Sequence, residues 1–353
     1  ADFQLTGNLL VCDEWQDSLV EIVASNNLLE GTIPANLGSF PALAQLWLDD
    51  NTLSGNPISV LNQLSQLESL HLGSNQFTGI IDDAFLANAK QLQALDVSNN
   101  QFTSTSFPPH LLEFPELLVL DLNRNNLQGS LPSSVPTNSV LRFFSVYKNA
   151  LQGSIPATIA NLNGLWHLDL SSNSFTGLLP SDIFSDNIYN LLLADLPTLQ
   201  QGLLPKSIDN LVNLEELSLR NSNRLGPLPE FSSTEYLYLV DLSENKFTST
   251  IPGSYSDLML SYLFLGQNSI EGTVPPLVVD ILELENTALF GDLSCTNVTM
   301  AIVPCNHVFS SCPCCQCCED CISDDSVHLD WTWEGEFDRE WDLVDESKLT
   351  PAR

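Results

Sequence analysis

Residues 117–132 read LLVLDLNRNNLQGSLP, and residues 141–156 read LRFFSVYKNALQGSIP. Aligned on their first Leu, both stretches have apolar residues at positions 1, 4, 6, 11 and 15, Asn at 9, Gly at 13 and Pro at 16. Full or partial copies start at Leu19, Leu43, Leu67, Leu92, Leu117, Leu141, Leu165, Ile188, Leu214, Leu237, Leu260 and Val279. The average spacing over residues 19–294 is 23 residues. Such a period predicts a stack of similar coils rather than several independent domains.

Each repeated position has a physical role. Apolar residues at positions 4 and 6 alternate, so they point to one face of a short strand, and stacked coils would pair these strands about 4.8 Å apart in a parallel sheet. The Asn at position 9 both donates and accepts hydrogen bonds, and we expect it to satisfy buried backbone groups where the strand turns away. It occurs as Asn27, Asn51, Asn75, Asn100, Asn125, Asn149, Asn173, Asn245 and Asn268.

The pattern L-x-x-L-x-L-x-x-N-x-L-x-G-x-I-P resembles the plant-type leucine-rich repeat. Similar proteins are receptor-like ectodomains, polygalacturonase-inhibiting proteins and secreted algal proteins with a Cys-rich C-terminal end. The resemblance implies an α/β solenoid, a right-handed superhelix of about twelve coils with its parallel sheet on the concave face. It implies an N-terminal cap at 1–18, the solenoid at 19–294, a Cys-rich cap at 295–321 and an acidic tail at 322–353.

Several coils depart from the pattern. Leu196 stands where the coil at 188 should have Asn, and Ser222 stands there in the next coil, where we expect its hydroxyl to substitute for the amide. GNPIS at 55–59 and FTSTSFPPHLLEF at 102–114 also break the repeat. These stretches predict local irregularities in an otherwise regular stack.

Composition limits the partners. Eleven Lys and Arg face 44 Asp and Glu, giving a formal net charge of -33. Such a chain repels nucleic acid and anionic membrane surfaces, since both interactions depend on basic residues. No apolar run approaches the roughly 18 residues of a membrane span. We expect a chain that begins after a cleaved signal or belongs to a longer protein, and that is secreted or is the ectodomain of a membrane-anchored protein.

Eight of the nine cysteines lie near the end of the chain, at Cys295, Cys305, Cys312, Cys314, Cys315, Cys317, Cys318 and Cys321. A soft-metal cluster and a set of disulfides are both compatible with this density. The position directly after the last coil favours disulfides that close the solenoid, because a stack needs a cap over its open end. Cys12 is left unpaired or joins another chain. Asn297, in NVT, is a glycosylation acceptor in a secreted protein.

Positions 2, 3, 5, 7 and 8 should point outward from the strands, and we call the surface they form the strand face. Asp recurs there at position 5, as Asp96, Asp121, Asp169 and Asp241, either as a consensus residue on a solvated face or as a cation-binding row. Aromatic and basic residues gather in the later coils, and exposed aromatic groups edged by Arg are typical of recognition surfaces. The alternative is amphipathic surface residues scattered singly. The predicted ligand-binding residues are Arg124, Arg142, Phe143, Tyr147, Lys148, Trp166, His167, Tyr189, Arg220, Tyr238, Tyr262 and Phe264.

No catalytic or phosphate-binding motif is present, and no cofactor or metal is expected. His71 and His167 share the predicted strand face but lie four coils apart, roughly 20 Å, too far for one metal site. The leading hypothesis is a non-catalytic extracellular module that binds a peptide, protein or glycan. The alternatives are a structural subunit of a matrix or larger assembly, and an inhibitor of a secreted hydrolase. Ice binding would need a flat, uncharged ladder of small polar residues, whereas the predicted strand face is charged and aromatic, so this function is not favoured.

The final segment, residues 322–353, contains ten acidic residues, three basic residues and three tryptophans. Trp331 and Trp333 alternate as on a strand, whereas Phe337, Trp341 and Val344 follow a helical spacing. We expect this tail to pack onto its own solenoid or onto a neighbouring chain, which would permit self-assembly or a larger complex. The alternative is a solvated linker.

Overall fold

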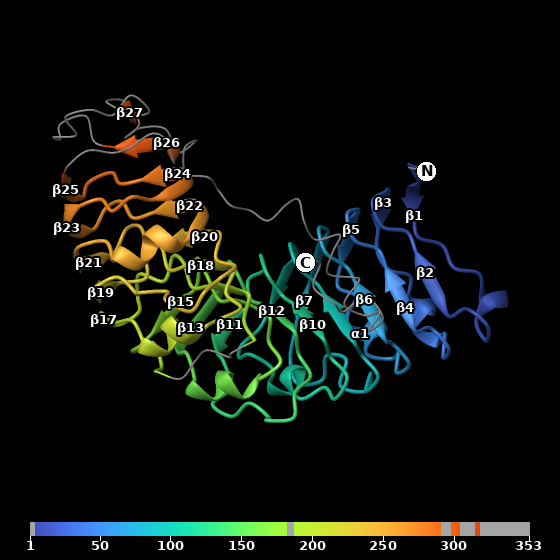
Figure 1. Ribbon diagram of the computed structural model, residues 1–353. Helices are drawn as coiled ribbons and strands as arrows, with labels where there is room; N and C mark the ends of the chain where they lie inside the picture. The colour runs from blue at the N-terminus through green and yellow to red at the C-terminus, as the bar shows by residue number, and fades with distance from the viewer. Residues whose placement is uncertain (1–3, 182–186, 291–297, 304–314, 318–353) are drawn as a thin grey trace. The chain divides into compact units, whose positions relative to one another are not determined.

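The computed structural model describes residues 4–181, 187–290, 298–303 and 315–317 (Figure 1). They form two compact units whose boundary lies between Ser174 and Phe175. We call residues 4–174 unit 1 and the described residues from Phe175 to Cys317 unit 2, and each is considered by itself. Both units are stacks of coils, as the sequence predicts.

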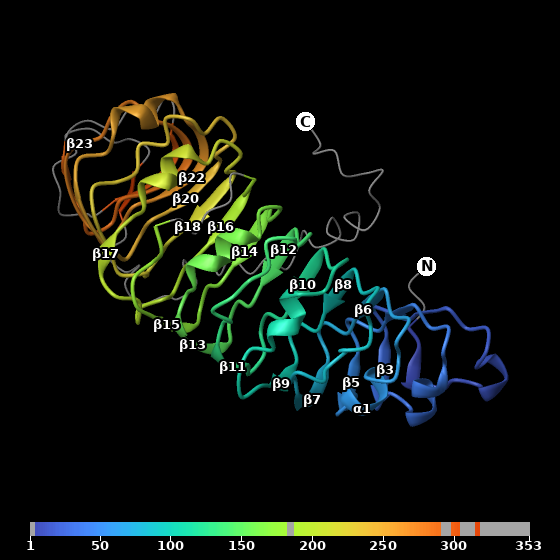
Figure 2. The same cartoon turned by 90° about the horizontal axis from the view of Figure 1, so that it is seen from below.

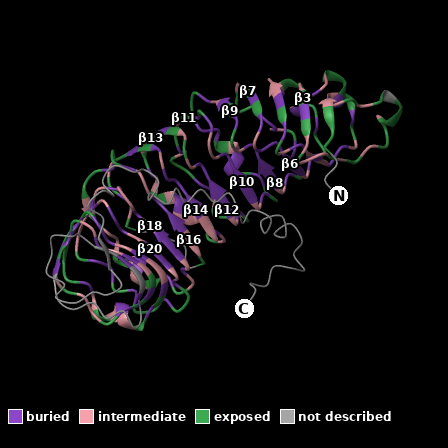
Figure 3. Cartoon of the chain, turned by 90° about the horizontal axis from the view of Figure 1, so that it is seen from above, coloured by how far each residue is buried: buried purple, intermediate pink, exposed green. Residues whose placement is uncertain are grey.

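In unit 1 the predicted strands form a parallel sheet. Its strands, in order, are β2 (Glu21–Val23), β4 (Gln45–Trp47), β6 (Ser69–His71), β8 (Ala94–Asp96), β10 (Val119–Asp121), β12 (Phe143–Ser145) and β14 (His167–Asp169). Each strand covers positions 3 to 5 of its repeat, and equivalent positions pair, so that Leu120 lies between Leu95 and Phe144. From β4 to β14 the position-4 residues are buried, whereas Ile22 in the first strand, β2, is half-buried. Figure 3 colours the buried residues of these strands purple. This register places every position-5 side chain beside its equivalents in neighbouring coils.

A second set of parallel strands, which the sequence does not predict, follows the Asn of each coil in unit 1. One sheet contains β1 (Thr6–Asn8), β3 (Leu28–Gly31), β5 (Thr52–Gly55), β7 (Gln76–Ile80) and β9 (Gln101–Thr103), and another pairs β11 (Gln128–Ser130) with β13 (Ala150–Ser154). The interruption after β9 coincides with the irregular stretch at 102–114. There the Ser104 hydroxyl donates to the Gln128 carbonyl and accepts from the Gln128 amide, at 2.9 and 3.0 Å.

Short helices lie on the side of the coils away from the first sheet. In unit 1 the 3-10 helices η2 (Ala35–Ser39) and η4 (Ala157–Asn161) begin directly after the repeat prolines Pro34 and Pro156. Proline suits this place because its φ is preset and its missing N–H is not needed. The irregular stretches form α1 (Ile58–Leu61) and η3 (Pro109–Leu112), while η1 (Asp13–Trp15) precedes the first coil.

Unit 2 repeats the arrangement (Figure 2). Its first sheet contains β16 (Asn190–Leu192), β18 (Glu216–Ser218), β20 (Leu239–Asp241), β22 (Met259–Phe264), β24 (Val278–Glu283), β26 (Val298–Val303) and β27 (Cys315–Cys317). Its second sheet contains β17 (Gly202–Leu203), β19 (Arg224–Gly226), β21 (Lys246–Ser249), β23 (Ser269–Thr273) and β25 (Ala288–Phe290). The 3-10 helices η5 (Lys206–Asn210) and η6 (Gly253–Asp257) again follow prolines, and β15 (Ser174–Thr176) lies at the boundary. Strand pairing therefore continues beyond residue 294, where the repeat pattern ends.

The asparagine ladder is confirmed. The Asn75 amide nitrogen donates to the carbonyls of Leu48, Leu72 and Gly73 at 2.9, 3.2 and 3.1 Å, and its oxygen accepts from the Leu53 amide at 2.9 Å. Asn51, Asn100, Asn125, Asn149, Asn173, Asn245 and Asn268 donate in the same way to three carbonyls, one of them in the preceding coil. One side chain thus satisfies the turn of its own coil and joins it to the coil before.

The two atypical coils of unit 2 are rebuilt around Ser222 and Arg224. The Ser222 hydroxyl donates to the Leu219 carbonyl at 2.5 Å, which confirms the predicted substitution for Asn. Arg224 occupies position 11, an apolar position in most coils, and its side chain is 1% exposed. Its guanidinium donates to the carbonyls of Ser222 and Gln200 at 2.8 and 2.7 Å. The core of unit 2 therefore contains an arginine held by backbone carbonyls.

Candidate functional site

Seven of the predicted ligand-binding residues come together on the strand face of unit 1. We call Arg124, Arg142, Phe143, Tyr147, Lys148, Trp166 and His167 the unit 1 patch. The Arg142 guanidinium lies over the Trp166 ring at 5.4 Å, and the Arg124 guanidinium lies over the Tyr147 ring at 5.5 Å. Phe143 and His167 pair across β12 and β14 and stack at 4.2 Å. The coil register thus assembles cation–aromatic pairs from three consecutive repeats.

Local backbone geometry positions the cations of the patch. Arg124 and Lys148 both have left-handed backbone, with φ of 49° and 52°, at the same position of adjacent coils. The Arg142 guanidinium donates to the Gly164 carbonyl at 2.9 Å. A Cβ on Gly164 would overlap that guanidinium, so any larger residue there would shift the end of the Arg142 side chain.

The exposure of the patch is graded. Lys148 is exposed, whereas Arg124, Arg142, Tyr147, Trp166 and His167 are half-buried. Phe143 is only 3% exposed, so it supports the surface from beneath and is a poor candidate for direct ligand contact. Among the described residues, no carboxylate forms an ion pair with Arg124, Arg142 or Lys148. The patch therefore presents positive charge that no described acidic side chain neutralises.

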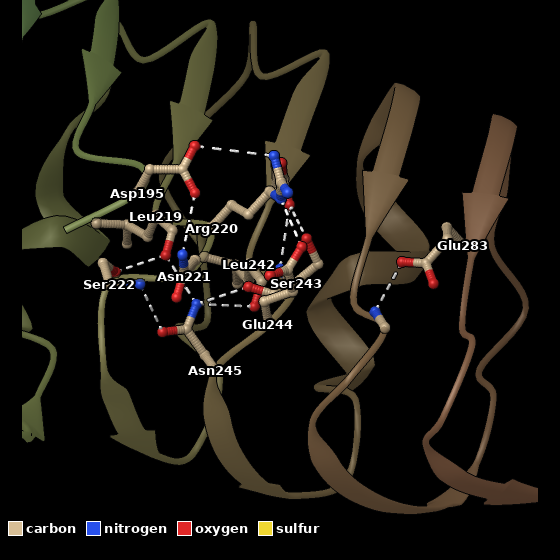
Figure 4. Close-up of polar contacts among 12 residues, drawn as sticks. Asp195, Leu219, Arg220, Asn221, Ser222, Leu242, Ser243, Glu244, Asn245 and Glu283 are labelled. Carbon is tan, nitrogen blue, oxygen red and sulfur yellow. Dashed lines mark hydrogen bonds and ion pairs between the residues drawn. The ribbon is translucent and has the colours of Figure 1, made fainter. Parts of the chain in front are cut away.

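The remaining predicted residues lie in unit 2 and differ in this respect. Arg220 donates from Nε to Glu244 at 2.7 Å, and its Nη1 lies 3.8 Å from Asp195 (Figure 4). Acidic residues of the two neighbouring coils therefore neutralise the charge of Arg220. Tyr262 and Phe264 lie on one face of β22 with ring centroids 6.3 Å apart, and Tyr189, Tyr238, Tyr262 and Phe264 are all half-buried. Unit 2 thus presents aromatic rings beside a neutralised arginine.

The position-5 carboxylates have a structural role. Asp96, Asp121 and Asp169 are 8%, 3% and 8% exposed, which corrects the expectation of a solvated face. Each accepts a hydrogen bond from the backbone amide two residues later, at 2.7 to 2.9 Å. Asp241 and Glu283 make the same contact, at 3.1 and 2.9 Å. These acids close the turn after the strand in five coils.

Burial changes the titration of these groups. Desolvation raises the pKa of Asp96 and of Asp169 to about 6, although their hydrogen bonds to Ser98 and Ser171 oppose the shift. Desolvation and the neighbouring Asp96 raise the pKa of Asp121 as well. Desolvation raises the pKa of Glu283 to about 7, against its hydrogen bonds from the Gly266 and Glu285 amides. Burying a carboxyl disfavours its charged form.

One polar network was missed by sequence reasoning. The Trp47 indole donates to the Ser69 hydroxyl at 2.9 Å, and this hydroxyl lies 2.8 Å from Nε2 of His71. The Trp47 and His71 rings also stack at 4.8 Å. The signal was available, because positions 3 and 5 of one strand share a face. Ser69 and His71 are 4% and 2% exposed, so this serine–histidine pair is a buried packing element with no access for a substrate.

The histidines of the described parts of the chain do not gather at a metal site. Burial lowers the pKa of both His71 and His167 to about 3, which keeps the two rings neutral. Within the described residues, no three His, Cys, Asp or Glu side chains converge in a way that could hold a metal ion.

Several predictions concern residues that the structure does not describe. Cys295, Cys305, Cys312, Cys314, Cys318, Cys321, Asn297 and the tail lie outside the described residues, and of Cys315 and Cys317 only the backbone of β27 is described. The disulfide cap and the glycosylation therefore stay predictions. Cys12 is exposed and forms no disulfide with any described residue. Over the described parts of the chain, no helix combines the length and apolarity that crossing a membrane requires.

Comparison with known proteins agrees with this architecture. The family described as Leucine Rich Repeat matches residues 66–87, 91–114, 116–138 and 164–185. A probable LRR receptor-like serine/threonine-protein kinase of Arabidopsis thaliana is 37% identical over 76 residues, which is 21% of this chain and 7% of that protein. The match thus covers only a small part of the length of that protein.

Solved structures are similar over most of the chain. PEPR1-AtPEP1 superposes with a TM-score of 0.75 and 31% identity, covering 82% of this chain and 41% of the other. The plant peptide hormone receptor RGFR1 in complex with RGF2 gives a TM-score of 0.72 and 27% identity, covering 85% of this chain and 53% of the other. The chain spans about half the length of these structures. The repeat, the two strand sets and these similarities identify the chain as a leucine-rich-repeat solenoid of the plant type, with the fold of receptor-like ectodomains.

Proposed function

We propose that the chain is a non-catalytic extracellular recognition module, and that the unit 1 patch is where it binds a peptide or protein ligand. The observation that carries this proposal is the set of three cations, two held over aromatic rings, that no described carboxylate neutralises. In a chain of net charge -33, two other described cations are used internally: Arg220 is ion-paired and Arg224 is buried.

The physical argument favours an anionic, partly apolar ligand. A carboxylate that contacts an arginine makes charge-assisted hydrogen bonds, which are about twice as strong as neutral ones. The rings of Tyr147 and Trp166 hold the guanidinium groups in place, which lowers the entropy lost on binding. The same rings offer apolar area to a side chain of the ligand.

The similar structures support a peptide ligand. PEPR1 was solved as PEPR1-AtPEP1, and RGFR1 is a plant peptide hormone receptor in complex with RGF2. The HAESA ectodomain, 25% identical with a TM-score of 0.66 and covering 85% of this chain and 57% of the other, was solved in complex with an N-terminal extended IDA peptide hormone ligand. A glycan ligand, a structural role in an assembly and inhibition of a hydrolase remain alternatives that no observed feature of the patch favours.

The test is ligand capture from the native extracellular fraction with the immobilised chain. The double variant Arg142→Glu and Lys148→Glu reverses two patch charges, and Trp166→Ala removes one supporting ring. Lys246→Glu is the matched control, because Lys246 is exposed and bonded to Asn223 in unit 2. We expect a protein or peptide retained by wild type and control but not by the patch variants. Equal retention by all four chains would refute the proposed site.

A further inference from the structure

The arginine in the core of unit 2 has more hydrogen-bond donors than the described residues satisfy. Arg224 is 1% exposed, and its Nε and Nη2 donate to the carbonyls of Ser222 and Gln200 at 2.8 and 2.7 Å. Its Nη1 is buried as well, and no described residue accepts a hydrogen bond from it. Buried polar atoms in folded proteins nearly always have a partner. The unpaired Nη1 therefore points to an acceptor that the described residues do not supply.

The positive charge of this arginine is also unmatched. Among the described residues no carboxylate forms an ion pair with Arg224, whereas Arg220, earlier in the same coil, contacts Glu244 and Asp195. Burial lowers the pKa of Arg224, yet a guanidinium stays protonated in proteins, so the charge persists in the core. A buried charge that has hydrogen bonds but no counter-charge is costly. The missing acceptor is therefore expected to be an anion.

The coil before Arg224 is irregular at this place. It is two residues longer than the regular repeat, with Pro205 at position 18 rather than 16, and its strand β17 begins only at Gly202, which pairs with Arg224. A Cβ on Gly202 would lie 3.5 Å from Nη1 of Arg224 and 3.1 Å from Cδ2 of Leu178. Both atoms thus border the side of Gly202 that has no side chain. Leu178 is 54% exposed, so it lies between this place and solvent.

These surroundings restrict the kind of anion. One positive charge with two carbonyl partners matches one negative charge, whereas a divalent phosphate or sulfate would leave negative charge unmatched beside an apolar side chain. A guanidinium is weakly hydrated, and an ion that enters such a place has to give up most of its water. A small halide such as chloride meets both conditions, because it is monovalent and accepts hydrogen bonds from any direction.

We propose that unit 2 binds a small monovalent anion of the halide class at Nη1 of Arg224, beside Gly202 and Leu178. The ion accepts the hydrogen bond that Nη1 lacks and neutralises the guanidinium, while the two carbonyls hold Nε and Nη2. In the unfolded chain water solvates the arginine, so the ion binds the folded state and stabilises the irregular coils by mass action. The site lies within unit 2 and is independent of the proposed function of the unit 1 patch.

Thermal unfolding of the full chain, followed by circular dichroism, tests this site. Chloride replaces gluconate from 0 to 0.2 M at constant ionic strength, so that charge screening stays the same. We expect the wild-type midpoint to rise by about 3 °C or more and to saturate. Arg224→Met should lose this rise. The matched control Lys246→Met removes an exposed cation from the next coil and should keep it.

Two outcomes of this experiment would overturn the proposal. A midpoint of wild type that does not respond to chloride would mean that water, rather than an anion, accepts from Nη1. An equal response of wild type, Arg224→Met and Lys246→Met would mean that chloride acts elsewhere on the chain.

Two further measurements cover the case in which Arg224→Met folds poorly. Gly202→Ala keeps the arginine and places a methyl group 3.5 Å from Nη1, so we expect a smaller chloride response, and a response equal to that of wild type would contradict the location. Wild-type crystals soaked in NaBr should show an anomalous peak at hydrogen-bonding distance from Nη1. A bromide peak without any chloride response in solution would mean an adventitious ion only and would overturn the proposal.

Discussion

Removing one rung of the asparagine ladder gives a direct test of how the coils are held together. In Asn75→Ala the Leu53 amide loses its acceptor, and three carbonyl oxygens lose a donor. A buried amide without a partner costs about 1–3 kcal/mol, and each lost hydrogen bond contributes about 1 kcal/mol net. Because carbonyls tolerate a missing donor better than amides tolerate a missing acceptor, we expect a loss of about 2–4 kcal/mol.

The assay is guanidinium denaturation followed by circular dichroism, with Asn88→Ala as the matched control. Asn88 is exposed and its side chain makes no hydrogen bond with a described residue, so its replacement should change stability by less than about 0.5 kcal/mol. Because coils interact mainly with their neighbours, the slope of the transition is compared as well as its midpoint. Equal midpoints for the two variants would show that the ladder does not hold the stack together.

Three further predictions follow from buried charge. Since burial raises the pKa of Glu283 from 4.5 to about 7, the folded state binds an extra proton in that window, and stability falls as pH rises through it. Between pH 5 and 8 this titration should lower the free energy of unfolding of wild type by up to about 3 kcal/mol, and Glu283→Gln should abolish that decrease. Denaturation at each pH measures it, and identical pH profiles for the two chains would contradict the prediction. Gly266→Ala should lower the melting temperature, because its Cβ would collide with the Glu283 carboxylate, and no change would exclude that packing. Arg224→Ala should cost about 3 kcal/mol but Arg220→Ala less than about 1 kcal/mol, since only Arg224 is buried; equal losses would refute this distinction.

Much of the fold could be predicted from the sequence because its signal is periodic. Apolar residues at positions 4 and 6 repeat every coil, so strand position and register follow directly, and Asn75 and its equivalents mark each turn. The second set of strands gave a weaker signal. Most of these strands hold a single buried apolar residue at position 11, such as Leu151 in β13, among polar or small residues, and no apolar alternation marks them as strands. In β11 (Gln128, Gly129 and Ser130), only backbone pairing with the next coil makes the strand.

The sequence was sufficient to place the candidate residues on the strand face, but not to predict which of them are buried or ion-paired. Stacking at strand spacing buries Asp121 and Phe143, although each points outward from its own coil. The neutralisation of Arg220 could have been predicted, since Asp195 and Glu244 occupy position 8 of the adjacent coils. Arg224 could not, because position 11 predicts an apolar residue and the irregular coil before it changes the local packing.

The central claim is that uncompensated cations on unit 1 bind an anionic ligand. The most direct measurement is the dissociation constant of the captured ligand for wild type, for the double variant Arg142→Glu and Lys148→Glu, and for the control Lys246→Glu, each at 0.05 and 0.5 M NaCl. We predict at least tenfold weaker binding by the double variant at low salt, unchanged binding by the control, and a difference that shrinks at high salt. Equal dissociation constants for all three chains at low salt would contradict the claim.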